Sequence, residues 1–164
     1  MKIKNYIVYL FLVLSISLFS SCDKGGNPNP GGTTVAKYAG DWFIKASDLD
    51  GTPEVDYKLH STYNTAANDN TMWIDDFKNG WTIKCKVTVN LANGTFTATD
   101  SENVYDGSIV TITEGKIEKN AATSLGGHTV DKISFKAHFD YGEDGTYDIL
   151  YEGHKRTGFL EDEY

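Results

Sequence analysis

The sequence has few cysteines and few basic residues, and each shortage excludes a class of fold or of binding partner. It holds only 2 cysteines in 164 residues, Cys22 and Cys85, so a disulfide framework cannot hold the fold together. Its 15 lysines and arginines are outnumbered by 23 acidic residues, which gives a net charge of −8. A negative surface repels phosphates. This argues against a nucleic-acid partner and against charge-driven binding to anionic lipid headgroups.

The common motifs of hydrolytic chemistry are missing as well. There is no G-x-S-x-G nucleophile elbow and no H-E-x-x-H zinc motif. No two of the four histidines stand at metal-ligand spacing, and solvated or locally hydrogen-bonded side chains are their simplest interpretation. They are His60, His128, His138 and His154. We therefore expect no metal and no cofactor, and the catalytic residues of any reaction stay unknown.

The first 21 residues differ in kind from the rest of the chain. Two lysines precede an apolar run over residues 7–19, and Ser20 and Ser21 lead directly to Cys22. The run is too short to span a bilayer, so residues 1–21 are typical of a secretory signal. A cysteine directly after the small residues resembles a bacterial lipobox. We expect Cys22 to be lipidated, and the alternative is a plain cleaved signal with an incidental cysteine.

Residues 22–34 form the next segment, which is rich in glycine, proline, asparagine and threonine. Such a segment has little to bury and cannot offset the entropy lost on ordering, so it is predicted to be a flexible tether. Residues 35–164 then make one domain. We expect the mature protein to be lipid-anchored in the cell envelope, with the outer membrane as the favoured location. Acyl chains would supply the attachment.

From residue 35 onward the dominant hydrophobic period is two. Between residues 81 and 91 every odd position is apolar and every even position is polar, which predicts a strand with one dry and one wet face. Short turns separate eight such segments, at 39–47, 54–61, 71–76, 81–91, 94–100, 108–118, 130–140 and 146–157. Sequential hairpins build a meander, and closing it removes the exposed edges. We predict an all-β, eight-stranded antiparallel up-and-down barrel.

The segment Gly40-Asp41-Trp42, at the start of the first strand, resembles the G-x-W signature of the calycins, which include lipocalins and fatty-acid-binding proteins. The resemblance implies that Trp42 closes one end of the barrel beneath a cation from the last strand. Arg156 is the expected cation, with Lys155 as the alternate. Strict alternation along the last strand would turn Lys155 inward, whereas a bulge at Gly153 would turn Arg156 inward.

A second resemblance covers nearly all of the mature chain. The lipobox, residues 41–51, 63–75 and 112–117 and the terminal GHKRTGF together resemble a family of Bacteroidetes lipoproteins catalogued as lipid-binding putative hydrolases. This resemblance implies a calycin-type barrel on a cell-envelope lipoprotein. It carries no catalytic residue over to this chain.

Eight strands enclose room for side chains or for one small apolar ligand, so a filled and an open barrel are both possible. The residues expected on the inner, ligand-binding face are Ile44, Tyr57, Leu59, Trp81, Ile83, Cys85, Phe135, Tyr147 and Ile149. Three functions remain: a lipoprotein whose barrel binds a lipid, a hydrolase of envelope lipid or glycan esters, and a non-catalytic accessory subunit of a surface complex. The expected partners are an apolar or lipid ligand, the membrane through N-terminal acyl chains, and an envelope protein.

Overall fold

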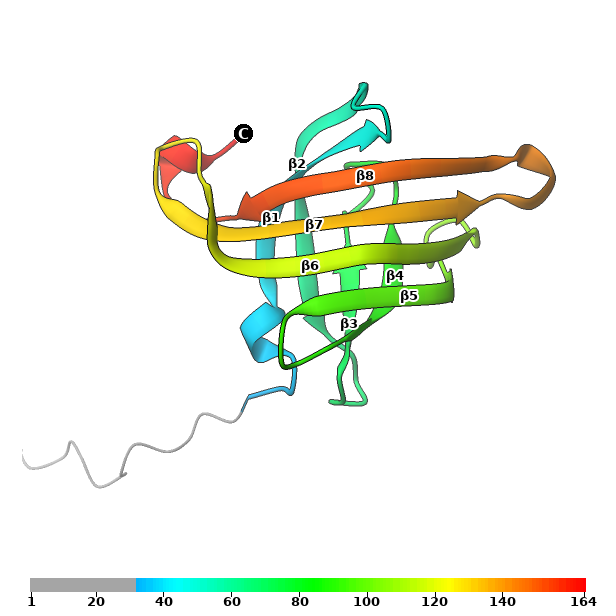
Figure 1. Ribbon diagram of the computed structural model, residues 1–164, viewed down its shortest axis with the longest axis horizontal. Helices are drawn as coiled ribbons and strands as arrows, with labels where there is room; N and C mark the ends of the chain where they lie inside the picture. The colour runs from blue at the N-terminus through cyan, green and yellow to red at the C-terminus, as the bar shows by residue number, and fades with distance from the viewer. Residues whose placement is uncertain (1–31) are drawn as a thin grey trace, which may run out of the picture. The chain divides into compact units, whose positions relative to one another are not determined.

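The computed structural model describes residues 32–164. The predicted signal peptide, the lipidation site Cys22 and most of the predicted tether lie outside these residues and stay predictions. Within residues 32–164, eight antiparallel strands follow one another around a closed barrel, and the last strand pairs with the first (Figure 1). This arrangement confirms the predicted all-β, eight-stranded up-and-down barrel.

The elements stand close to the positions that the period of two predicts. The strands are β1 (Gly40–Asp48), β2 (Pro53–Asn64), β3 (Thr71–Asp75), β4 (Lys84–Val89), β5 (Thr95–Glu102), β6 (Ile109–Thr123), β7 (Thr129–Asp140) and β8 (Thr146–Lys155). Short 3-10 helices occur at η1 (Ala36–Tyr38), η2 (Gly142–Asp144) and η3 (Leu160–Asp162). No helix within residues 32–164 is long and apolar enough to cross a membrane.

Successive strands run in opposite directions, so their connections alternate between the two ends of the barrel. The turns after β1, β3, β5 and β7 share one end, which we call the loop end: residues 49–52, 76–83, 103–108 and 141–145. The helix η1 and the turns after β2, β4 and β6 share the opposite end, which we call the floor. Any site built from loops therefore draws on segments far apart in sequence.

Side chains fill the barrel interior. Phe135 of β7 stacks on Tyr151 of β8, with ring centroids 4.4 Å apart and planes 8° from parallel. Phe96 meets Phe135 edge-on from β5 at 5.7 Å. The large interior side chains are 0 or 1% exposed. Each contributes about 1.5–3 kcal/mol through burial, so these rings and aliphatic chains form the core of the fold.

Candidate functional site

Trp42 closes the floor of the barrel. Its indole Nε1 donates to Thr62 Oγ1 at 2.9 Å, and Thr62 Oγ1 in turn donates to the carbonyl oxygen of Tyr38 at 2.7 Å. The indole is fully buried. Lys155 holds its Nζ over the Trp42 ring at 5.7 Å from the centroid. A Cβ at Gly40, where φ is +151°, would lie 3.1 Å from Lys155 Cε, so this glycine gives clearance to the lysine stem.

Arg156 does not cover Trp42, which corrects the expected barrel-closing pair. Its Nε donates to Glu163 Oε1 at 2.8 Å, and its guanidinium lies over the ring of Phe43, 6.0 Å from the centroid, on the outside of the barrel. The pairing of β1 with β8 runs from Asp48 to Trp42 without a register shift. No bulge interrupts β8 at Gly153, so strict alternation turns Lys155 inward and Arg156 outward.

Five of the nine residues expected on the inner face lie in the packed interior. They are Ile44, Ile83, Cys85, Phe135 and Ile149, and each is 0 or 1% exposed. Burial also raises the pKa of the Cys85 thiol to about 12, so the thiol stays protonated and inert at neutral pH. These five side chains belong to the core and leave no surface on which a ligand could rest.

Tyr57 and Leu59 lie on the outer face, which corrects their expected inward placement. Tyr57 stacks on Tyr164 at 4.5 Å, and Leu59 is the cross-strand partner of the outward-facing Phe43. The cause is a register shift between β1 and β2. Ile44 pairs with Lys58 but Ala46 pairs with Val55, so β2 holds one extra residue and its alternation changes face.

Trp81 and Tyr147 meet at the loop end, where they form part of an aromatic cluster. Trp81 precedes β4 rather than belonging to it, and its ring lies 5.8 Å from that of Tyr147. Tyr141 contacts Tyr147 at 5.8 Å and stacks on the core residue Phe139 at 6.0 Å. We call Trp81, Tyr141 and Tyr147 the aromatic cap. Tyr147 remains 49% exposed, so the cap presents aromatic surface to solvent above the filled core.

Further large apolar side chains are exposed around the loop end. Leu49, Phe77 and Val104 stand on three of its turns, and Ile109 begins β6 beside them. The turn after β6 and the C-terminal residues 159–164 expose large apolar side chains as well, so exposure alone does not single out the loop end as a binding surface. Sequence alternation could not find Leu49, Phe77 and Val104, because they stand in turns, which have no period of their own.

A buried polar pair lies deeper in the barrel. His60 of β2 and Tyr151 of β8 are 1% and 0% exposed, and their rings meet edge-on with centroids 6.1 Å apart. His60 Nδ1 lies 2.9 Å from the carbonyl oxygen of Lys58. A carbonyl only accepts, so Nδ1 carries the proton and Nε2 is left as an acceptor. Neither His60 Nε2 nor Tyr151 Oη has a hydrogen-bond partner in the described part of the chain.

The same burial fixes the protonation of this pair. Desolvation lowers the pKa of His60, and the nearby charges of Asp76 and Asp75 offset only part of that effect. Burial raises the pKa of Tyr151 well above its ordinary value, and Asp76 adds to the rise. At neutral pH the pair therefore consists of a neutral imidazole acceptor and a phenolic donor.

The turn between β3 and β4, residues 76–83, covers this pair, and we call it the Asp76 loop. The buried Asp76 carboxylate accepts the backbone N–H groups of Lys78, Gly80 and Thr82 at 2.9, 3.1 and 2.7 Å. Phe77, Lys78 and Thr82 have φ of +54, +62 and +61°, which is costly for residues with a side chain. A Cβ at Gly80 would lie 3.4 Å from His60 Nε2, so the loop backbone passes directly over that atom.

The neighbouring Asp75 anchors the loop from the outer face. It accepts from Lys84 Nζ at 2.8 Å, Tyr63 at 2.7 Å and Tyr105 at 2.6 Å. Burial disfavours the charged carboxylate, but these three donors and the backbone N–H of Phe77 outweigh it and lower the pKa of Asp75 to about 2. The network joins β2, β3, β4 and the turn after β5, so Asp75 holds together the strands from which the Asp76 loop rises.

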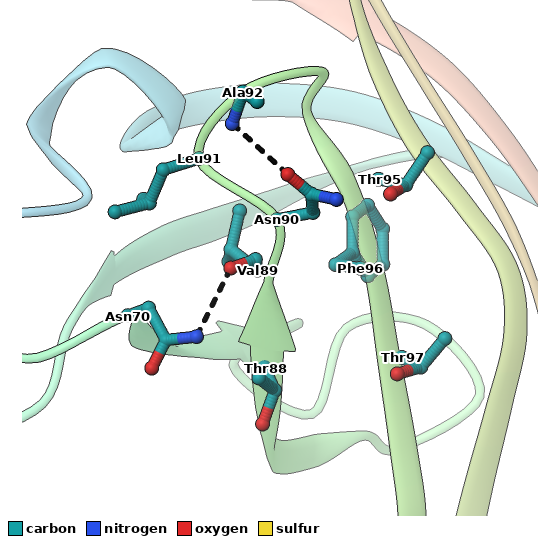
Figure 2. A pocket seen from close by; sticks show the side chains of 9 residues that line it. All are labelled: Asn70, Thr88, Val89, Asn90, Leu91, Ala92, Thr95, Phe96 and Thr97. Carbon is teal, nitrogen blue, oxygen red and sulfur yellow. Dashed lines mark hydrogen bonds between the residues drawn. The ribbon is translucent and has the colours of Figure 1, made fainter.

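A separate hollow of about 610 Å³ lies between β4 and β5, toward the floor (Figure 2). These strands pair only at Thr88 with Thr97 and at Val89 with Phe96. Figure 2 shows the two hydrogen bonds at its edge, from Asn70 Nδ2 to the Val89 carbonyl and from the Ala92 amide to Asn90 Oδ1. Its lining mixes threonine and asparagine side chains with the apolar side chains of Val89, Leu91, Ala92 and Phe96.

Within residues 32–164, no serine or cysteine side chain is hydrogen-bonded to a histidine ring. This part of the chain also holds no cluster of three potential metal ligands.

A family model described as lipid-binding putative hydrolase matches residues 27–160. No curated protein matches the chain.

Proposed function

Because the chain belongs to the lipid-binding putative hydrolase family, we propose that its barrel binds a lipid at the loop end, over the aromatic cap. The observation that carries this placement is the aromatic cluster above the filled core, in which Tyr147 is exposed while Trp81 and Tyr141 are half-buried. Aromatic rings of this kind bury large apolar areas while their hydroxyl and indole groups stay near water, which suits contact with a lipid.

The filled interior supports binding at the rim rather than deep inside the barrel. A ligand chain that reached past Tyr151 toward the floor would have to displace packed rings such as Phe135 and Phe96. Removing such contacts from a close-packed core costs several kcal/mol, which few lipid contacts could offset. At the loop end, by contrast, a lipid covers the exposed ring of Tyr147 and the half-buried rings beside it without opening the core.

The proposal includes attachment to the cell envelope through lipid on Cys22. It rests on the sequence of residues 1–34, in which a short apolar run, small residues and a cysteine are followed by a polar tether. Acyl chains at the N-terminus would keep the domain beside the outer membrane, where lipids are available. The role proposed for the domain is to bind lipid without catalysing a reaction.

Replacement of a cap tryptophan tests the proposal. We expect Trp81→Ala to weaken binding of a radiolabelled long-chain alcohol by at least about tenfold, since an aromatic contact of about 1.5 kcal/mol is lost. Trp73→Ala is the matched control, because Trp73 lies on β3 beside Lys86, which holds its Nζ 5.5 Å from the ring centroid. Equal affinities of the two variants would overturn the placement, and an absence of binding to the wild type would overturn the function.

A further inference from the structure

Two polar atoms in the barrel lack the partners that buried polar atoms almost always have. His60 Nε2 and Tyr151 Oη are both buried, and both are unpartnered among the described residues. An unpaired buried polar atom destabilises a fold, so it calls for an explanation in terms of a missing partner. Here two such atoms belong to side chains in edge-on contact, which points to one shared partner.

The hydrogen-bonding character of the two atoms defines that partner. His60 Nε2 accepts, because the Lys58 carbonyl holds the proton on Nδ1, and Tyr151 Oη is free to donate. A hydroxyl group donates one hydrogen bond and accepts another, so it satisfies both atoms at once. A carboxylate would face the lone pair of Nε2 and the charge of Asp76, and an ammonium could not accept from Tyr151.

The covering of this pair is a strained loop. The Asp76 loop passes its Gly80 backbone over His60 Nε2, and residues Phe77, Lys78 and Thr82 hold unfavourable left-handed conformations. Hydrogen bonds to Asp76 keep the loop in this form. Trp81 of the aromatic cap belongs to the same loop, so a lipid that engages the cap acts directly on the cover of His60.

We propose that His60 and Tyr151 bind the hydroxyl group of a neutral lipid, such as a long-chain alcohol or a monoacylglycerol, which displaces the Asp76 loop on entry. This inference deepens the proposed lipid binding and rests on it. The hydroxyl donates to His60 Nε2 and accepts from Tyr151 Oη, while the hydrocarbon chain extends outward and lies over the aromatic cap. Selectivity for neutral hydroxylated lipids follows, because Asp76 disfavours an anionic headgroup at this depth.

The test compares two ligands and two variants on the full-length protein. Tyr151→Phe removes the donor from an atom that has no partner, so the variant should fold at least as stably as the wild type. We expect it to bind 1-hexadecanol at least about fivefold more weakly, the loss of one hydrogen bond, and to bind hexadecane unchanged. Tyr57→Phe removes a tyrosine hydroxyl from the outer face and is the matched control, with unchanged affinity for both.

A spectroscopic measurement separates direct contact from an effect on structure. Addition of 1-hexadecanol should shift the ¹⁵N resonance of His60 Nε2 as its lone pair accepts a hydrogen bond, and hexadecane should not. If both ligands bind the wild type equally and Tyr151→Phe changes neither affinity, lipid binding stands and the hydroxyl site is wrong. A water molecule retained between His60 and Tyr151 in a crystal with bound alcohol would also overturn it. Failure of both ligands to bind the wild type would overturn the proposed function itself.

Discussion

His60 shows how strongly one residue depends on its surroundings. In solution its imidazole would titrate near pH 6.5, but burial inside the barrel lowers its pKa in spite of the two nearby aspartates. The neutral ring then donates from Nδ1 to the Lys58 carbonyl and leaves Nε2 facing the Asp76 loop. The proposed role of His60 as an acceptor therefore requires a pH at which the ring stays neutral.

This shift predicts a pH dependence of stability. Below about pH 6.5 the unfolded chain binds a proton at His60 that the folded chain excludes. The contribution of neutral His60 to the free energy of unfolding is therefore fully present above that pH. It is lost as the pH falls toward the lowered pKa of the folded state. We expect the urea concentration at the unfolding midpoint to decrease when the pH is lowered from 7.5 to 5. The decrease should be smaller in His60→Gln. Equal decreases in the two proteins would contradict the buried, neutral histidine.

Among the strands, β4 and β2 show what the sequence could and could not predict. The alternation through Cys85, Val87 and Val89 places a dry face inside the barrel, and the structure buries all three. The same rule fails on β2, because the extra residue opposite Ile44 and Ala46 changes the facing of Tyr57. A bulge cannot be predicted from the hydrophobic pattern, because the residues before it and after it each still alternate between apolar and polar.

The Asp76 loop is the element that sequence reasoning missed most completely. Its left-handed residues are Phe77, Lys78 and Thr82, and none of them has a preference for that conformation. The conformation depends on the Asp76 carboxylate, which accepts three backbone N–H groups only after the chain has folded around it. The candidate site therefore depends on tertiary contacts, whereas the barrel depends on a repeating pattern that the sequence displays.

Asp75 fixes the strands on which this loop stands, and its replacement should loosen them. We expect Asp75→Asn to lower the free energy of unfolding by about 2–3 kcal/mol, because hydrogen bonds to a charged, buried carboxylate are lost. The pKa of Asp75 is depressed from its ordinary 3.8 to about 2, so its contribution is present above pH 3.8 and disappears as the pH falls through 2.

Chemical denaturation between pH 2 and pH 6 measures both effects. The wild type should lose stability across this acid range more steeply than Asp75→Asn, which has no carboxylate to protonate at this position. A variant as stable as the wild type at pH 6 would show that the network with Lys84, Tyr63 and Tyr105 does not hold the strands.

At the scale of the whole molecule, different regions of the barrel provide the stability of the fold and the proposed binding of a lipid. The floor is closed by Trp42 under Lys155, and the interior is filled by stacked rings, so these regions provide the stability of the fold. The loop end carries the aromatic cap and the strained loop, which covers the unpartnered polar pair beneath it. A molecule built in this way can move a loop to admit a ligand while its core stays packed.

The central claim is that lipid binds at the loop end, and fluorescence quenching by a brominated long-chain alcohol tests it most directly. Bromine quenches a tryptophan that it contacts, and the three tryptophans stand at the floor, on the outer face of β3 and at the loop end. We expect the bound alcohol to quench the wild type and Trp73→Phe alike, and to lose most of this quenching in Trp81→Phe. Quenching that persists undiminished in Trp81→Phe would contradict the account.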